Sequence, residues 1–221
     1  MTRQTVVGIN KDTHEIVPIG KVEHTGLKCN CVCYNCENVL EAVLNTPTPT
    51  RPYFRHSNKS NCNPSPETEL HLLAKTIILN NSRIYIPERG WTDYCNPVCE
   101  VRYNELIPDA TIQIDGFSYY IEVVVTNGIN KQKREQYQQN NSPVLVIDFK
   151  EEDRDLEYAV LEYLVLEEPS NRHVLAYPDI SGNCGHDKWL IAGLTCVAGI
   201  LITLISWNTR SKKNNSEKNR Y

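Results

Sequence analysis

The sequence lacks a continuous apolar run near its start, where residues 1–20 begin Met-Thr-Arg-Gln. A secretory signal peptide needs such a run behind a basic start. We therefore expect that the chain is not exported in this way. In a reducing compartment, its nine cysteines should be free thiols or metal ligands rather than disulfides.

The sequence also lacks an excess of positive charge, since 23 Lys and Arg stand against 27 Asp and Glu, a formal net charge of −4. A protein with this balance has no general polycationic attraction for nucleic acid. Basic residues are nevertheless concentrated in 51–89 and at 131–134, and acidic residues in 151–168. Any contact with nucleic acid is therefore expected to use the two basic regions.

The most informative stretch runs from Pro108 to Asn127, where two β-rich runs flank the turn pair Asp115-Gly116. If this pair is the loop of a hairpin, the register places Asp109 directly opposite Glu122. Alternation then sorts the side chains onto two faces. The apolar face holds Ala110, Ile112, Ile114, Phe117, Tyr119, Ile121, Val123 and Val125, and the polar face holds Asp109, Thr111, Gln113, Ser118, Tyr120, Glu122 and Thr126, with Val124 as the exception.

Two directly opposed carboxylates repel one another unless a cation or a proton lies between them. A divalent metal ion between Asp109 and Glu122 is one resolution. A solvated hairpin face on which two acids happen to meet is the other, and the spacing favours neither.

Four residues near the start have the spacing of a tetrahedral zinc site: the close pair Cys33 and Cys36, followed by His56 and Cys62. Zinc would replace a core that this Pro-rich segment cannot build. Disulfides or buried thiols are the alternative. Further cysteines without an assigned role lie at Cys29, Cys31, Cys95 and Cys99.

The elements around the hairpin predict an α/β order. Ser65-Pro66-Glu67 begins a helix whose apolar stripe is bordered by Glu69, with His71 and Lys75 on the opposite side. After the hairpin we expect a polar helix over 129–139, a buried strand over 143–149 parallel to its neighbour, and a helix over 152–167. The last helix should turn Leu156, Val160 and Leu164 inward.

The end of the sequence predicts a membrane anchor. Trp189 to Trp207 carries no charge and has a Trp at each end, and a helix of this length spans about 28 Å, close to the hydrocarbon thickness. A buried core helix is the alternative. The topology signals conflict, because the basic residues after the span favour a cytoplasmic tail, which would place the N-terminal domain outside. A long domain weighs little in this charge rule, and the Cys-rich segment suits a reducing space. We therefore expect a single-pass C-terminal anchor with the N-terminal domain in the cytoplasm.

These residues resemble one known family in their order and spacing. The chain resembles the competence protein CoiA-like family, whose core looks like the PD-(D/E)xK nuclease fold behind a zinc-binding segment. The similarity covers about residues 25 to 150. It is carried by Cys33-x-x-Cys36, Phe54-Arg55-His56, Cys62, Glu67 to Lys75, Pro108-Asp109-Ala110, Ile121 to Thr126 and Val146-Ile147-Asp148.

The resemblance implies a nuclease that hydrolyses phosphodiester bonds of nucleic acid, expected to be DNA, with Mg²⁺ or Mn²⁺. It makes Asp109 and Glu122 the metal-binding acids, with the carbonyl of Val123, and Glu69 the helix acid that supports them. Where the wider fold has Lys, this sequence has Val124. Thr126 shares the face and could hold a water, and Lys133 could reach in from the next helix. Nucleic-acid contacts are expected at Arg51, Arg55, Lys59, Lys133 and Arg134.

The resemblance therefore predicts a restriction-endonuclease-like mixed sheet flanked by helices, with a small zinc module before it. The C-terminal transmembrane helix is predicted from the apolar run alone and lies outside the resemblance. The competing function is a non-catalytic, membrane-tethered protein that binds nucleic acid or acts as a scaffold on the same fold. A third hypothesis is a zinc-stabilised interaction module in which these acids are merely surface residues. The predicted parts are an N-terminal hairpin and zinc-binding module at 1–64, a nuclease-like domain at 65–167, a linker at 168–188, the span at 189–207 and a basic tail at 208–221. The hairpin is expected to pair Thr5 to Ile9 with Glu15 to Ile19.

Overall fold

The hairpin around Asp115-Gly116 lies at the centre of one sheet in the computed structural model, which describes residues 4–44, 51–58, 61–63, 65–126 and 128–175. Strand β9 (Ala110–Ile114) pairs antiparallel with β10 (Phe117–Val124), and Phe117 lies opposite Ile114 as predicted. Asp115 and Gly116 both have positive φ, at 52° and 82°, the backbone geometry of a tight primed turn. The register predicted from the sequence is confirmed.

Three further strands complete this sheet, whose order is β12-β11-β10-β9-β8. Strand β11 (Val144–Asp148) runs parallel to β10, as the sequence predicted, while β8 (Cys95–Cys99) and β12 (Arg172–Val174) are antiparallel edges. The sheet is therefore mixed, and the chain has an α/β fold.

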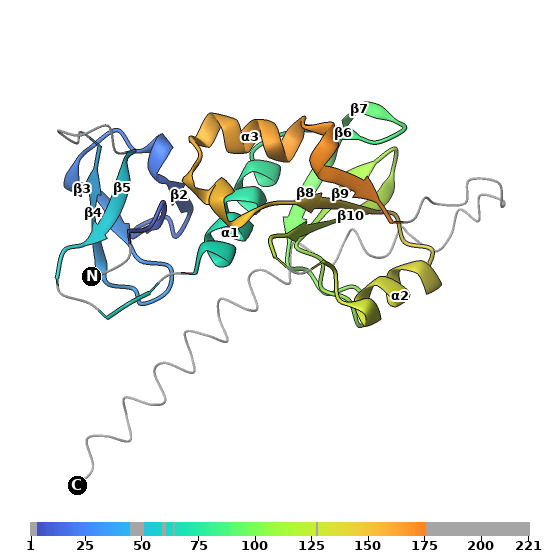
Figure 1. The fold of residues 1–221 in the computed structure, drawn as a ribbon, viewed down its shortest axis with the longest axis horizontal. Helices are drawn as coiled ribbons and strands as arrows, with labels where there is room; N and C mark the ends of the chain where they lie inside the picture. Colours follow the sequence, from blue (N-terminus) through green and yellow to red (C-terminus); the bar gives the residue numbers. More distant parts are fainter. Residues whose placement is uncertain (1–3, 45–50, 59–60, 64, 127, 176–221) are drawn as a thin grey trace, which may run out of the picture. The chain divides into compact units, whose positions relative to one another are not determined.

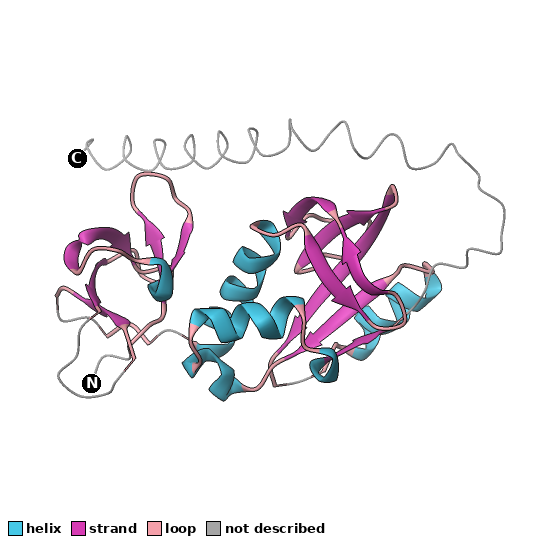
Figure 2. Cartoon of the chain, turned by 90° about the horizontal axis from the view of Figure 1, so that it is seen from above, coloured by secondary structure: helices cyan, strands magenta, loops and turns pink. Residues whose placement is uncertain are grey.

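Helices cover both faces of this sheet (Figures 1 and 2). Helices α1 (Pro66–Leu79) and α3 (Tyr158–Leu166) share one buried core with the predicted apolar face of the hairpin. Helix α2 (Lys131–Gln139) covers the other face, where Tyr137 packs against Tyr120, Val144 and Val146. The face predicted to be polar is thus partly closed by α2, which buries Tyr120.

The N-terminal segment forms a second sheet of order β2-β1-β3-β4-β5. The predicted hairpin at its start is present, since β1 (Val7–Asn10) pairs with β2 (Ile16–Pro18). The 3-10 turn η1 (Ile19–Lys21) leads on to β3 (Gly26–Val32), β4 (Val39–Val43) and β5 (Tyr53–His56). Side chains of this sheet belong to the same core as α1 and α3, so the described residues form one compact unit.

The predicted helix over 152–167 is wrong in its first half. Residues Glu151–Asp155 form a 3-10 turn, η2, and the backbone is extended at Leu156 and Glu157 before α3 begins at Tyr158. The interruption also changes which side chains face the core. Leu156 and Val160 are exposed and Leu164 is half-buried, whereas Leu161, Val165 and Leu166 are buried.

A small separate hairpin and a buried arginine complete the described fold. The hairpin pairs β6 (Arg83–Ile86) with β7 (Gly90–Asp93). Arg172 at the start of β12, next to the short turn η3 (Pro169–Asn171), donates hydrogen bonds to the carbonyls of Tyr85, Leu164 and Glu168. Burial lowers the pKa of Arg172 to about 10. Its guanidinium ties α3 to this hairpin and to the sheet edge.

No helix within the described residues is long and apolar enough to cross a membrane. The predicted span Trp189 to Trp207, most of the linker and the basic tail lie outside those residues. The membrane anchor therefore stays a prediction from the sequence.

Candidate functional site

The predicted zinc ligands meet in the N-terminal sheet. Their ligand atoms, contributed by Cys33, Cys36, His56 and Cys62, all lie within 4.8 Å of one another. The turn between β3 and β4 carries the two close cysteines, and β5 ends with His56. The Sγ atoms of Cys33 and Cys62 are 3.7 Å apart, and Cys36 Sγ is 3.3 Å from Nε2 of His56.

The chemistry of this cluster fits a metal ion. Burial lowers the pKa of His56, which favours the neutral imidazole that coordinates metals. Burial raises the pKa of Cys33 to about 12. A thiolate at this position therefore needs a nearby cation, and three thiols with one imidazole are a donor set suited to zinc. The cluster could hold a metal such as zinc, and its four members are those predicted from the sequence.

Cys29 and Cys31 do not belong to the cluster. Cys29 donates to the carbonyl of Leu40, and the thiol of Cys31 contacts the carbonyl of Cys29. Cys95 is exposed and Cys99 is half-buried on β8, in the other sheet. Within the described residues, both pairs are free thiols.

The two acids predicted to face each other lie where the β9–β10 ladder ends. Its last pair is Ala110 and Ile121, so the next step outward sets Asp109 beside Glu122. The carboxylate of Asp109 accepts a hydrogen bond from the backbone N–H of Val123 at 2.9 Å and lies 3.3 Å from Nδ1 of His71. Although burial opposes ionisation, these hydrogen bonds lower the pKa of Asp109 below its ordinary value.

Glu122 is more deeply enclosed than Asp109. Its side chain is 6% exposed, and it accepts hydrogen bonds from Lys133 Nζ at 2.7 Å and from the Tyr137 hydroxyl at 2.5 Å. Burial raises the pKa of Glu122 in spite of these bonds, and the negative charge of Asp109 acts in the same direction. Two carboxylates with opposite pKa shifts therefore lie side by side, with one ammonium group between α2 and the sheet.

Helix α1 turns a different residue toward this site than the sequence predicted. His71, which we expected on the far side, contacts Asp109. Glu69 is fully buried, and its carboxylate pairs with Arg154 of η2 at 3.2 Å. Lys75 is also buried and pairs with Glu100 at 2.6 Å. The support predicted from Glu69 is thus offered to Asp109 by His71.

The remaining predicted site residues lie along β10. Val123 points into the core, and its backbone N–H is held by Asp109. Val124 is half-buried against the cluster of Tyr137. Thr126 is exposed just beyond the strand.

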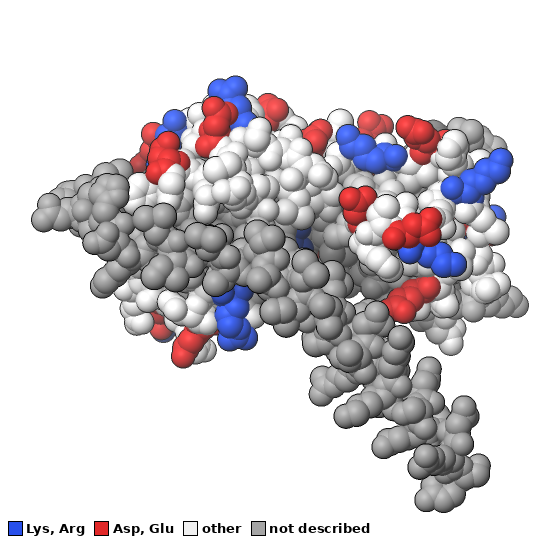
Figure 3. Space-filling model, turned by 180° about the vertical axis from the view of Figure 1, so that it is seen from behind, with Lys and Arg blue, Asp and Glu red and all other residues white. Residues whose placement is uncertain are grey.

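The basic residues predicted to contact nucleic acid are mostly engaged within the chain. Arg51 bonds to the carbonyl of Arg154 and to Asp155, and Arg55 pairs with Glu41 at 2.8 Å. Arg134 is exposed on α2, and Lys59 lies outside the described residues. On the face drawn in Figure 3, the Lys and Arg side chains of described residues lie among Asp and Glu side chains rather than in one basic area.

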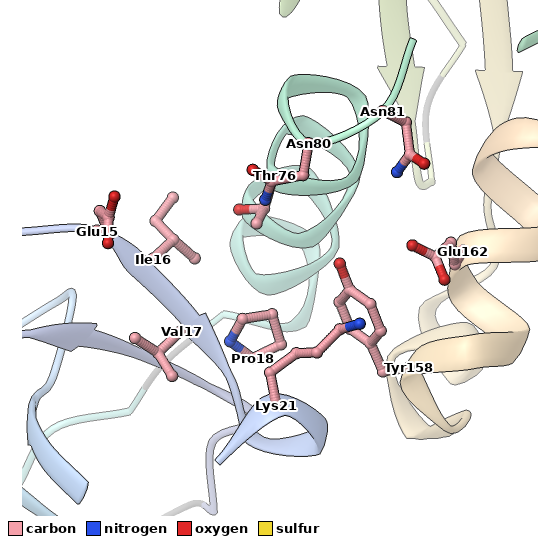
Figure 4. Close-up of a pocket in the computed structure, with 10 residues that line it drawn as sticks. All are labelled: Glu15, Ile16, Val17, Pro18, Lys21, Thr76, Asn80, Asn81, Tyr158 and Glu162. Atoms are coloured by element: carbon pink, nitrogen blue, oxygen red, sulfur yellow. The ribbon is translucent and has the colours of Figure 1, made fainter. Parts of the chain in front are cut away.

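A pocket of about 370 Å³ is lined by residues that belong neither to the Cys/His cluster nor to the Asp109 and Glu122 site (Figure 4). It is bounded by β2 and η1, by the C-terminal end of α1 and by α3. Lys21 lies over the ring of Tyr158 at its edge, 4.7 Å from the ring centroid. The aliphatic, amide and acidic side chains around it do not form a set of convergent catalytic groups.

Sequence reasoning missed Tyr137, His71 and Arg154. Tyr137 is the one aromatic residue of an otherwise polar helix, and such a residue is a signal of the buried face. His71 and Arg154 carried no comparable signal, because their partners come from distant elements.

No protein-family model matches the sequence, and neither a curated protein nor a solved structure matches the chain. The resemblance to the CoiA-like family is therefore a prediction carried by motifs. The structure by itself establishes a mixed α/β fold with a Cys/His cluster in its N-terminal sheet.

Proposed function

We propose that the chain is a CoiA-like nuclease with a restriction-endonuclease-like core, which hydrolyses phosphodiester bonds of DNA with Mg²⁺ or Mn²⁺ and is tethered to the membrane through Trp189 to Trp207. The observation that carries the proposal is the pairing of Asp109 and Glu122 at the open end of the β9–β10 ladder. A buried acid beside a partly buried one, with opposite pKa shifts, is typical of functional sites.

The acids and the carbonyl of Val123 would hold the divalent ion, because carboxylate and carbonyl oxygens are its preferred ligands. When bound, the ion would polarise the phosphate and lower the pKa of a water. His71 and the N–H of Val123 keep Asp109 ionised and fix its orientation. The hydrogen bond from the Tyr137 hydroxyl fixes the orientation of the Glu122 carboxylate.

Lys133 provides the positive charge that a Lys at position 124 would supply and that Val124 cannot. Its ammonium lies 2.7 Å from Glu122, and its charge also favours the ionised form of Asp109. It therefore pairs with Glu122 although it comes from α2. An ammonium at this place can offset charge on a phosphate and orient a water.

The N-terminal cluster is proposed to bind zinc in a structural role. All four positions are filled by protein ligands, and closed sites of this kind stabilise a fold rather than hold a substrate. The segment between β4 and β5 is rich in proline. A bound ion would therefore fix β5 and the following turn to the β3–β4 hairpin.

The proposal is tested by incubating the purified protein with labelled DNA, single- and double-stranded, with Mg²⁺, with Mn²⁺ or with EDTA. We expect metal-dependent cleavage that is lost in Asp109→Asn and kept in Asp93→Asn, an acid whose side chain is 88% exposed. Cleavage that persists in Asp109→Asn contradicts this site.

The second candidate is a non-catalytic protein that binds nucleic acid on the same fold. It is favoured by the ion pair between Lys133 and Glu122, which satisfies that carboxylate without a metal. Metal-independent DNA binding by a wild-type protein that cleaves nothing would support it.

A further inference from the structure

A second pair of polar groups, Asp148 and His173, lies on the same sheet face as Glu122. The Nδ1 of His173 is 3.3 Å from Oδ2 of Asp148, and both side chains are about half exposed, at 49% and 48%. Nδ1 faces the carboxylate, and Nε2 makes no hydrogen bond within the part of the chain that the structure describes. Nε2 is therefore the ring nitrogen available to a ligand.

The strand registers place this pair relative to the proposed site. Glu122 on β10 is paired with Val146 on β11, and Val146 is paired with His173 on β12. Because adjacent strands lie about 4.8 Å apart, the backbones of Glu122 and His173 are roughly 10 Å apart in one row across the sheet.

The burial pattern shows that these residues share a face. Val144 and Val146 pack in the cluster of Tyr137, whereas Leu145 and Ile147 pack in the core of α1 and α3. Asp148 continues the first set by alternation, and it is paired with Val124. The two neighbours of His173 on β12 face the opposite side of the sheet. Arg172 donates a hydrogen bond to the carbonyl of Leu164 in α3, and Val174 packs against the core of α1 and α3. Both members of the pair therefore point to the side on which Glu122 lies.

Deepening the proposed function, and resting on it, we propose that His173, oriented by Asp148, is a substrate-positioning residue that donates a hydrogen bond from Nε2 to a backbone phosphate of the nucleic acid. The phosphate would be one adjacent to the bond that is cleaved, because the row sets His173 apart from Glu122 by one strand. The Asp148 carboxylate accepts the proton on Nδ1. A phosphate beside Nε2 would favour a second proton on that nitrogen, and the ring would then donate from both nitrogens. The ordinary alternative is a solvated ion pair that protects an edge strand from pairing.

The experiment measures binding separately from cleavage. The full-length protein is titrated into fluorescein-labelled DNA, single- and double-stranded, with Ca²⁺ in place of Mg²⁺, and anisotropy gives Kd. His173→Ala should weaken binding roughly tenfold, the value of one hydrogen bond to a charged group. His173→Arg retains a charged donor and should stay within about threefold of wild type. His24→Ala, at an exposed position of the N-terminal segment, is the matched control.

Cleavage kinetics separate this role from a structural one. Since the contact is made equally in the ground state and the transition state, His173→Ala should raise KM and leave kcat unchanged. Thermal unfolding of the variant should match wild type, because the side chain is half exposed. If His173→Ala binds DNA as wild type and His24→Ala do, the inference is overturned. A wild type that binds but shows no Asp109-dependent cleavage overturns the proposed function instead, and the anisotropy still decides the role of His173. A wild type that binds neither single-stranded nor double-stranded DNA overturns both the proposed function and the role of His173.

Discussion

The carboxylate of Asp109 accepts the backbone N–H of Val123 at 2.9 Å, on the strand to which its own strand is paired. Asp109 thereby closes the end of the β9–β10 ladder with a side chain in place of a backbone carbonyl. The same carboxylate faces His71. One residue therefore has a structural role and a proposed metal-binding role, and substitutions must be designed to separate them.

Asp109→Asn and Glu122→Gln should have opposite effects on stability. The pKa of Asp109 is lowered in the folded state, so its charge contributes stability that is present above pH 3.8 and lost as pH falls through the folded value. Asp109→Asn should cost roughly 1 kcal/mol at pH 7, and the difference from wild type should shrink below pH 4.

The raised pKa of Glu122 has the opposite sign. Its ionisation costs folded-state stability as pH rises from 4.5, its ordinary value, through the raised folded value. Glu122→Gln should therefore be as stable as wild type or more stable at pH 7. Urea unfolding at pH 7 and near pH 3.5 measures both differences, and equal losses in the two variants would contradict these assignments.

Lys133→Ala should reduce cleavage at least tenfold, because it removes the ammonium that pairs with Glu122. Lys131→Ala is the control, since Lys131 lies on the same helix with its side chain 90% exposed. Val124→Lys introduced into the Lys133→Ala protein should restore part of the activity, because Val124 shares the face of Glu122. A Lys133→Ala protein with full activity would show that this cation has no catalytic role.

Cys33→Ser should release zinc and destabilise the N-terminal sheet. Wild-type protein is expected to contain about one zinc ion per chain by elemental analysis. Cys95→Ser, at an exposed position outside the cluster, should keep both zinc and stability. Zinc-free wild type whose melting temperature is unchanged by chelators would exclude a structural metal.

Glu69→Ala should destabilise the protein by roughly 3–5 kcal/mol, because it removes the buried carboxylate partner of Arg154 and leaves only the exposed carboxylate of Asp155. Glu69→Ala combined with Arg154→Met should recover much of that loss. Chemical unfolding of the single and double variants measures the coupling. If Glu69 instead acts at the site as the resemblance implies, the double variant will be stable but inactive.

The sequence was most informative where local rules decide the structure. The turn pair at Asp115 set the register of the hairpin, and the metal-ligand spacing identified all four members of the Cys/His cluster. The polar helix predicted over 129–139 is present as α2. Each of these features depends on residues close together in the chain or on a fixed ligand chemistry.

The sequence was least informative where a helix must be rotated correctly against a distant partner. In α1, the sequence predicted Glu69 at the border of the apolar stripe and His71 on the opposite side, but Glu69 pairs with Arg154 of η2 and His71 contacts Asp109. Around Leu156, the helical pattern continues through residues whose backbone is extended. Tertiary contacts override local propensity at both places.

The bonds that Arg51 makes to Arg154 and Asp155 join positions separated by 103 and 104 residues, and the carbonyl of Gln4 meets Arg154 across 150 residues. Contacts of such long range slow folding, because the loop must close before the contact forms. During synthesis, the first strands must wait for the η2 segment to leave the ribosome before their last partners exist. Chains truncated before residue 151 should therefore expose apolar surface and depend on chaperones.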